Sequence, residues 1–180
     1  MIFSNILVAA TLALTTYASP HRSHHSHPSK MHSRSTTTSN ASGTITITNN
    51  LNETIYLHST SSSSSASTLS ANGGTYTEST SDNSGTGISI KMSTTQDESS
   101  VLQFEYTDDG TTLFWDLSCI DLDSDSALVR AGFSATPEDS SCTGVSCDPG
   151  DSDCAEAYQQ ADDQDTNSCG SGVGVGVALG

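Results

Sequence analysis

The stretch VLQFEYTDDGTTLFWDLS, residues 101–118, decides the fold class of this 180-residue chain. Its two arms, 101–106 and 113–117, are rich in apolar and aromatic residues. The Asp109-Gly110 pair between them is one of the strongest short-range signals for a β-hairpin. The stretch therefore predicts two antiparallel strands joined by a tight turn.

Short segments of the same kind lie on both sides of this hairpin. Ile45 and Ile47 alternate with threonines, which is the period of a strand with one buried face. Further candidate strands are 55–57, 75–77, 88–91, 128–129, 133–135 and the tail 173–179, with a serine loop at 59–67. Eight or nine short strands separated by turn residues predict an all-β antiparallel sandwich or barrel. The one helix candidate is 154–161, which Asp151, Ser152 or Asp153 could cap.

The composition excludes several classes of protein. The chain has 5 Lys and Arg against 21 Asp and Glu, a formal net charge of −16. Binding of nucleic acid is disfavoured, because phosphate contacts need clustered basic residues. No segment reaches the ~20 apolar residues of a membrane-spanning helix, so no membrane span is predicted. The length fits one domain of about 100–200 residues.

The chain divides into three parts. Residues 1–18 read as a secretory signal peptide, because an apolar run ends in small residues at Thr16 and Ala18. Residues 19–43 are rich in His, Ser and Thr, and predict a disordered arm that cannot bury enough surface to offset its ordering entropy. The arm's histidines could bind Zn²⁺ or Cu²⁺ weakly, or form a basic patch at low pH. Residues 44–180 form the β domain. Its tail fits a closing strand better than a lipid-anchor signal.

The cysteines indicate an oxidising compartment and a cross-linked tail. Disulfides are expected in a protein with a signal peptide. The segment 142–169 holds four of the five cysteines, many Asp and few apolar residues, so cross-links would have to hold it. Two bridges among four cysteines allow three pairings, with the fifth left over or bridging into the tail. Zinc is disfavoured, because the Cys-x-x-Cys spacing is absent. The five disulfide candidates are Cys119, Cys142, Cys147, Cys154 and Cys169.

Acidic residues offer two weak candidates for chemistry. Asp121, Asp123 and Asp125 imitate the start of a calcium loop, but the Gly and Glu that such loops need at positions 6 and 12 are missing, so a solvated turn is expected. Glu105 and Asp116 lie on adjacent predicted strands, and a glycosidase needs two carboxyl groups about 5–10 Å apart. No established catalytic motif accompanies them. The sequence predicts no catalytic residue, no cofactor and no enzymatic activity.

Two N-glycosylation sequons begin at Asn40 and Asn52. Asn52 lies in the turn predicted between the strands 44–48 and 55–57, where a glycosylating enzyme can reach it. Asn52 and Asn40 are therefore the candidate glycosylation sites.

Three groups of residues, in order, resemble the small fungal thaumatin-like secreted proteins, which include antigenic, yeast-phase-specific proteins. The first is GTITITNN at 43–50 with IYL at 55–57. The second is QFEY at 103–106 with LFWDLS at 113–118. The third is the spacing Cys142-x₄-Cys147-x₆-Cys154-Ala-Glu-Ala-Tyr158, followed by Cys169.

This resemblance implies a thaumatin-like antiparallel β-sandwich with a disulfide-stapled, partly helical, acidic C-terminal segment. It also implies a secreted, wall-associated or spore-surface protein without catalysis, acting in spore germination or wall morphogenesis. Such a protein would be an adhesin or invasin for host matrix or cell-surface proteins of the laminin and integrin class. The alternatives are a protein that binds or hydrolyses wall β-1,3-glucan, and a secreted effector. Plant relatives carry glucan-binding acidic clefts and eight disulfides, whereas this chain can form two at most.

Overall fold

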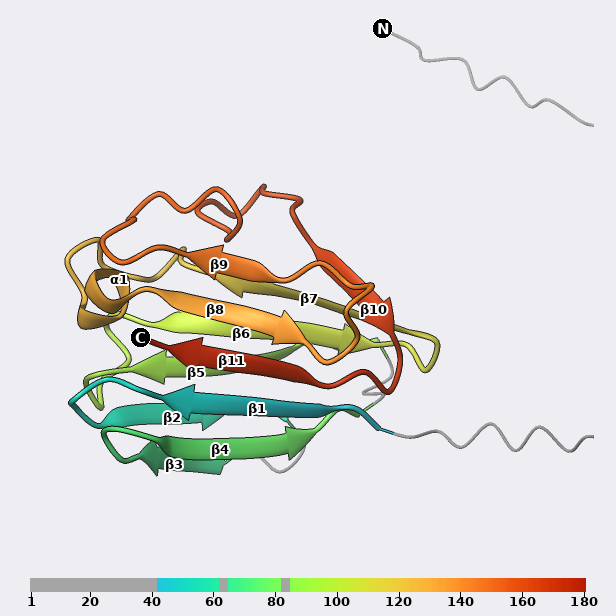
Figure 1. Ribbon diagram of the computed structural model, residues 1–180, viewed down its shortest axis with the longest axis horizontal. Coiled ribbons are helices and arrows are strands. Elements are labelled where there is room, and N and C mark those ends of the chain that lie inside the picture. Colours follow the sequence, from blue (N-terminus) through green and yellow to red (C-terminus); the bar gives the residue numbers. More distant parts are fainter. Residues whose placement is uncertain (1–41, 62–64, 82–84) are drawn as a thin grey trace, which may run out of the picture. The chain divides into compact units, whose positions relative to one another are not determined.

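A computed structural model describes residues 42–61, 65–81 and 85–180. The predicted signal peptide, nearly all of the predicted arm and Asn40 lie outside these ranges. Within them the chain forms eleven strands and one short helix, arranged in two sheets (Figure 1). The all-β sandwich expected from the short alternating segments is confirmed.

The smaller sheet contains both ends of the β domain. Its strand order is β4-β1-β11-β8-β9. The strands are β1 (Thr44–Asn49), β4 (Gly74–Ser79), β8 (Phe133–Pro137), β9 (Val145–Cys147) and β11 (Val175–Leu179). The tail forms a strand as expected, and Val175, Val177 and Leu179 on one of its faces are buried.

The larger sheet has the order β10-β7-β6-β5-β2-β3. Its strands are β2 (Ile55–Ser59), β3 (Ser65–Leu69), β5 (Ile88–Ser93), β6 (Leu102–Asp108), β7 (Thr112–Ser118) and β10 (Asn167–Gly170). The predicted hairpin is confirmed as β6–β7, with Glu105 opposite Asp116. The carboxylates of Asp108 and Asp109 close its turn by accepting backbone N–H bonds.

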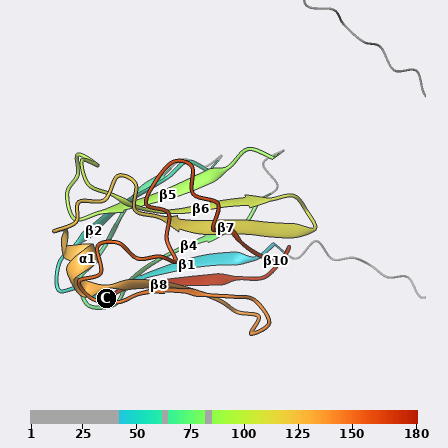
Figure 2. The same cartoon turned by 90° about the horizontal axis from the view of Figure 1, so that it is seen from above.

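The two sheets pack face to face, and Figure 2 shows β5, β6 and β7 in one layer and β1 and β8 in the other. Their facing side chains are apolar and fully buried, including Ile45 and Ile47 from one sheet and Ile90 and Phe104 from the other. Trp115 stacks on Phe104, with ring centroids 5.8 Å apart. Because alternate residues enter this core, the residues between them point outward from each sheet.

Several details differ from the sequence-based expectations. Strand β1 pairs with β11 in parallel, so the sandwich is antiparallel everywhere except at this pair, where the C-terminal strand inserts between β1 and β8. The segment 128–129 is part of helix α1 (Ala127–Ala131), which Ser126 caps. Residues 65–67, the last third of the predicted serine loop, belong to β3.

The helix expected over 154–161 does not form, and this segment consists of turns. Its backbone groups bond elsewhere: the amide of Tyr158 donates to Leu117 and its carbonyl accepts from Cys119. The carboxylate of Asp163 accepts from the amides of Gln159 and Gln160. A helix needs those same groups for its own ladder, so pairing with the end of β7 excludes it.

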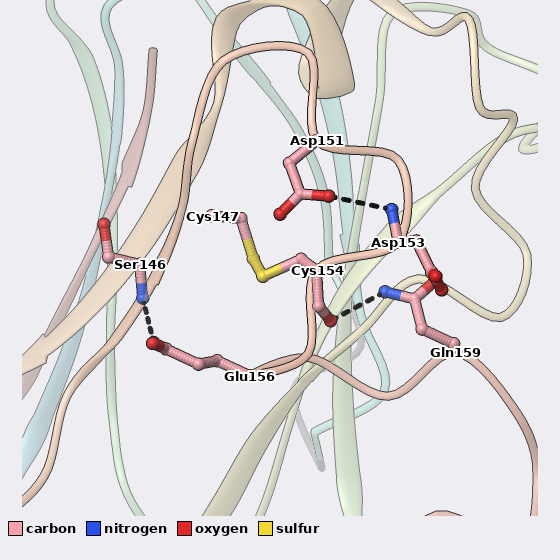
Figure 3. Close-up of a disulfide and its surroundings, with 7 residues drawn as sticks. All are labelled: Ser146, Cys147, Asp151, Asp153, Cys154, Glu156 and Gln159. Atoms are coloured by element: carbon pink, nitrogen blue, oxygen red, sulfur yellow. Dashed lines mark hydrogen bonds between the residues drawn. A yellow bond between two sulfur atoms is a disulfide. The ribbon is translucent and has the colours of Figure 1, made fainter.

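Disulfides join Cys142 to Cys169 and Cys147 to Cys154. The first ties the loop after β8 to β10. The second closes a short acidic loop beside β9, in which Asp151 accepts a bond from the amide of Asp153 (Figure 3). Cys119 is free and half-buried, and burial raises the pKa of its thiol to about 11. Among the described residues, no helix is long and apolar enough to cross a bilayer.

Candidate ligand-binding face

The outward face of the larger sheet carries the most distinctive group of polar side chains. A depression of about 340 Å³ lies over β5, β6 and β7, and we call it the carboxylate depression. Glu105 and Asp116 line it, together with Ser89, Thr107 and Phe114, and Thr166 closes one side. Each of these strand residues occupies an outward position of its strand, so the alternation that builds the core also builds this face.

Glu105 and Asp116 sit directly opposite each other on β6 and β7. Opposed residues on one face have Cβ atoms about 4.5–5.5 Å apart, so the structure brings together the two carboxyl groups singled out from the sequence. Burial, and then the charge of Glu105, raise the pKa of Asp116 to about 7. The Asp116 carboxyl group therefore titrates near neutral pH. Its Oδ1 atom is buried and has no hydrogen-bond partner among the described residues.

Phe114 supplies an apolar surface beside the two carboxyl groups. Its side chain is 42% exposed, which is unusual for a large apolar residue in this domain. Trp115, the next residue, is 1% exposed and belongs to the core, so it offers no surface to a ligand. The depression therefore combines one exposed ring, two carboxyl groups and several hydroxyls, which is a set suited to hydrogen bonding a polyhydroxylated ligand.

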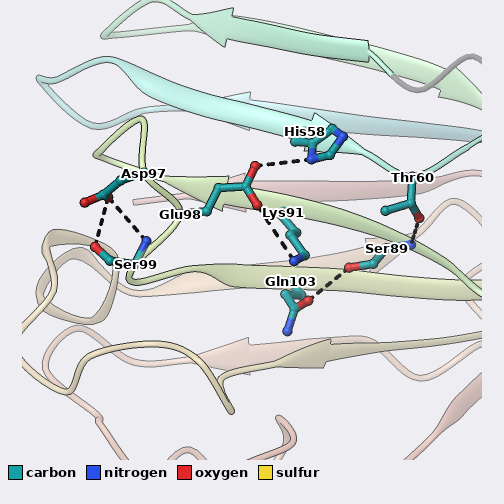
Figure 4. A network of polar contacts seen from close by, with 8 residues as sticks. All are labelled: His58, Thr60, Ser89, Lys91, Asp97, Glu98, Ser99 and Gln103. Atoms are coloured by element: carbon teal, nitrogen blue, oxygen red, sulfur yellow. Dashed lines mark hydrogen bonds and ion pairs between the residues drawn. The ribbon is translucent and has the colours of Figure 1, made fainter.

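A second cluster lies on the same face, toward the other edge of the sheet (Figure 4). Glu98, in the loop between β5 and β6, places Oε1 3.2 Å from His58 Nδ1 and Oε2 3.8 Å from Lys91 Nζ. His58 is on β2 and Lys91 opposes it on β5. Sequence reasoning missed this cluster, because Glu98 lies 40 positions from His58.

Another carboxylate that the sequence did not single out, Glu78, joins the two sheets. It accepts hydroxyl hydrogen bonds from Ser59 at 2.7 Å and from Tyr76 and Tyr106 at 2.8 Å each. Burial, followed by the bond to Glu78, raises the pKa of Tyr106. With three donors already bound, this carboxylate is a structural cross-brace between β4 and the larger sheet.

The remaining predicted sites are separate from this face. Asp121, Asp123 and Asp125 are exposed in the loop between β7 and α1. In the described part of the chain, no group of three or more His, Cys, Asp or Glu side chains could hold a metal ion. Asn52 is exposed in the turn between β1 and β2, where a glycan would meet solvent.

Comparisons with known sequences agree with the resemblance seen in the motifs. The family model described as Blastomyces yeast-phase-specific protein matches residues 32–179. A secreted thaumatin-like protein, calA, of Emericella nidulans is 52% identical over 93 residues, covering 52% of this chain and 54% of that protein. An antigenic thaumatin-like protein of Arthroderma benhamiae is 42% identical over 93 residues, covering 51% and 46%. The chain thus matches about half the length of these curated relatives.

Solved structures confirm the thaumatin-like fold. The protein elicitor MoHrip2 from Magnaporthe oryzae has a TM-score of 0.63 at 22% identity, covering 76% of this chain and 98% of that one. The thaumatin-like xylanase inhibitor TLXI has a TM-score of 0.52 at 10% identity, covering 75% and 97%. At such identities the likeness concerns the fold alone.

Proposed function

Because this chain belongs to the family of the Blastomyces yeast-phase-specific protein, we propose that it is a secreted fungal surface protein that binds a wall polysaccharide without catalysis. The observation that carries the proposal is the carboxylate depression. It places Glu105, Asp116 and the exposed ring of Phe114 on one rigid sheet face. Wall association, spore germination and wall morphogenesis are the processes in which such binding would act.

Secretion is supported independently of the ligand. The relative from Emericella nidulans is named as a secreted protein, and this chain begins with a stretch that reads as a signal peptide. Its two disulfides are the kind that persist in an oxidising compartment. Neither curated relative is named for an enzymatic activity, which supports a non-catalytic role.

The chemistry of the depression favours a polysaccharide as ligand. Sugar hydroxyls are donors, and the carboxyl groups of Glu105 and Asp116 are acceptors placed side by side. The Phe114 ring can cover the apolar face of a sugar ring. A strongly anionic polymer is disfavoured by the net charge of −16. A neutral wall β-glucan fits these requirements.

Binding of the secreted protein to insoluble β-1,3-glucan tests the proposal. We expect Phe114→Ala and Glu105→Gln each to weaken binding at least about 10-fold, because each removes a contact on the open face. Glu53→Gln, an exposed Glu in the turn between β1 and β2, is the matched control and should bind as the wild type does. Equal binding by all four proteins would refute a role for this face.

A second candidate is adhesion to a host matrix or cell-surface protein, or action as a secreted effector. The disulfide-closed loop favours it, since residues 148–153 are all exposed and include Asp148, Asp151 and Asp153 (Figure 3). Solid-phase binding to laminin and to integrin tests this role. Asp151→Asn should reduce capture, and Asp125→Asn, on a different exposed loop, should not.

A third candidate is hydrolysis of β-1,3-glucan by Glu105 and Asp116. It is favoured by the raised pKa of Asp116, which would hold a transferable proton below about pH 7. Release of reducing sugars, lost in both Glu105→Gln and Asp116→Asn, would establish it. No release from a protein preparation that binds the polymer would leave binding as the function.

A further inference from the structure

We propose that a second depression on the same sheet face, over β2 and β3, is a second subsite for the same polysaccharide. The inference rests on the proposed function and deepens it, because it makes the ligand a linear polymer that contacts both depressions at once. We call this second depression the Tyr56 depression.

The Tyr56 depression has the size and composition of a small-ligand site. Its volume is about 390 Å³, within the range of about 300–1,000 Å³ that is typical of such sites. It is lined by Tyr56, His58, Ala66, Thr68, Gln96 and Glu98, among others. Ala66 and the Tyr56 ring provide apolar surface, and the other four side chains provide hydrogen-bonding groups.

Polar contacts within the protein hold the loop that carries Glu98. Glu98 has a φ of 51°, a left-handed conformation that is uncommon for residues other than Gly and tends to occur at functional sites. Its carboxylate is held between His58 and Lys91, as Figure 4 shows. The neighbouring Asp97 accepts bonds from the hydroxyls of Thr95 and Ser99, which lower the pKa of Asp97. These contacts position the Glu98 side chain without a ligand. Its carboxylate oxygens can still accept hydrogen bonds beyond those from His58 and Lys91.

The two depressions repeat one arrangement. In the first, the exposed Phe114 ring lies beside Glu105 and Asp116. In the second, the half-buried Tyr56 ring lies beside Glu98. A ring paired with a carboxylate at two places on one face suits a ligand that repeats the same chemical unit.

The sheet fixes the spacing between the two depressions. Three strand-to-strand steps separate β2 from β7, which at about 4.8 Å per step gives about 14 Å across the strands. The register adds about 13 Å along them at roughly 3.3 Å per residue, because Tyr56 pairs with Ser93 whereas Glu105 pairs with Ser89. Lys91 and Gln103 lie between them, and Ser89, which lines the carboxylate depression, donates a hydrogen bond to Gln103 at 3.1 Å (Figure 4). Because these residues belong to paired strands of one sheet, the distance between the two depressions is fixed. A polymer of sufficient length can therefore contact both depressions without an entropic penalty for ordering the protein.

Binding of linear β-1,3-glucan oligosaccharides of two to ten units to the secreted protein tests this inference. We expect weak binding of the shortest oligosaccharides at the carboxylate depression. Affinity should then rise about 100-fold over a narrow range of length, when a second contact becomes possible. Tyr56→Ala should remove this rise and leave the affinity for short oligosaccharides unchanged, whereas Phe114→Ala should weaken binding at every length.

Two further variants distinguish loss of the second subsite from a folding defect in Tyr56→Ala. Glu98→Gln preserves the shape of the loop and should also reduce the rise with length. Thr77→Ala, on the exposed side of β4 in the other sheet, should behave as the wild type does. An unchanged length profile in both Tyr56→Ala and Glu98→Gln, with Phe114→Ala still impaired, would overturn the second subsite and leave the proposed function intact. Failure of the wild-type protein to bind any oligosaccharide or the polymer would overturn both.

Discussion

The main part of the β-sandwich, residues 44–137 with 175–179, and the acidic segment 138–170, which adds the edge strands β9 and β10, are stabilised in different ways. The sandwich buries almost all of its large apolar side chains between two sheets. The acidic segment buries few apolar residues beyond its cysteines, and two disulfides tie it to itself. Burial of apolar side chains thus stabilises the sandwich, whose sequence has recurring apolar residues. Disulfide bonds stabilise the acidic segment, whose sequence has few. The candidate ligand-binding face belongs to the first part and is bordered by the second at β10.

The largest effect is expected in the sandwich. Phe104→Ala should lower the free energy of unfolding by about 4 kcal/mol, because it leaves a cavity beneath Trp115 at the centre of the core. Denaturant unfolding followed by circular dichroism measures this. Phe114→Ala is the matched control, since its ring is 42% exposed and its loss should change stability by less than about 1 kcal/mol. Similar losses in the two variants would contradict the assignment of inner and outer faces.

The next largest loss of stability is expected on removal of the disulfides, and it should affect the acidic segment more than the sandwich. Removing the Cys142–Cys169 bridge with a double alanine variant should destabilise the acidic segment by about 3–4 kcal/mol, on the loop-entropy model for a separation of 27 residues. Removing Cys147–Cys154, with a separation of 7, should have a smaller effect of about 2 kcal/mol.

Limited proteolysis followed by mass spectrometry would locate the damage in these disulfide variants. Cleavage should fall within 138–170 while strands β1 to β8 stay protected, because these strands are held by burial and neither bridge joins any of them. Simultaneous cleavage throughout the domain would show that the two regions unfold as one unit.

A smaller effect, dependent on pH, is expected at the boundary between core and ligand face. The pKa of Asp116 is raised to about 7 in the folded protein, so its protonated form is favoured by folding and stability falls as the pH rises from about 4 through 7. Asp116→Asn should therefore stabilise the protein at pH 8 by about 2 kcal/mol, after allowance for partial solvent screening, and by almost nothing at pH 4. Thermal melts at both values measure the difference. Asp125→Asn, on an exposed loop, is the control for the loss of one negative charge.

The smallest effect concerns the helix just before β8. The Ser126 hydroxyl accepts a bond from the Val129 amide at 3.1 Å and caps α1. Ser126→Ala should lower stability by about 1 kcal/mol, whereas Ser124→Ala in the exposed loop before it should be neutral. Denaturant midpoints measured side by side would resolve the two. A neutral Ser126→Ala would mean that packing of Leu128 and Val129, and not the cap, holds the helix.

Features that depend on local sequence pattern could be predicted before the structure was known. The period of two in 44–48 allows only one residue in two to enter the core, so this strand and its inner face could be predicted. The Asp109-Gly110 turn determined that β6 and β7 pair, and therefore that Glu105 and Asp116 would lie close together. The acidic composition of 142–169 indicated that cross-links were needed there.

Other features depend on contacts between distant segments and could be seen only in the folded protein. These include the parallel pairing of β1 with β11, the choice among three disulfide pairings, and the turns at 154–161 in place of a helix. They also include the position of Glu98 between His58 and Lys91, and the two depressions on one face. The physical reason is that sequence patterns fix which way a side chain points from its own strand. Which strands become neighbours depends on how all the apolar faces are buried together.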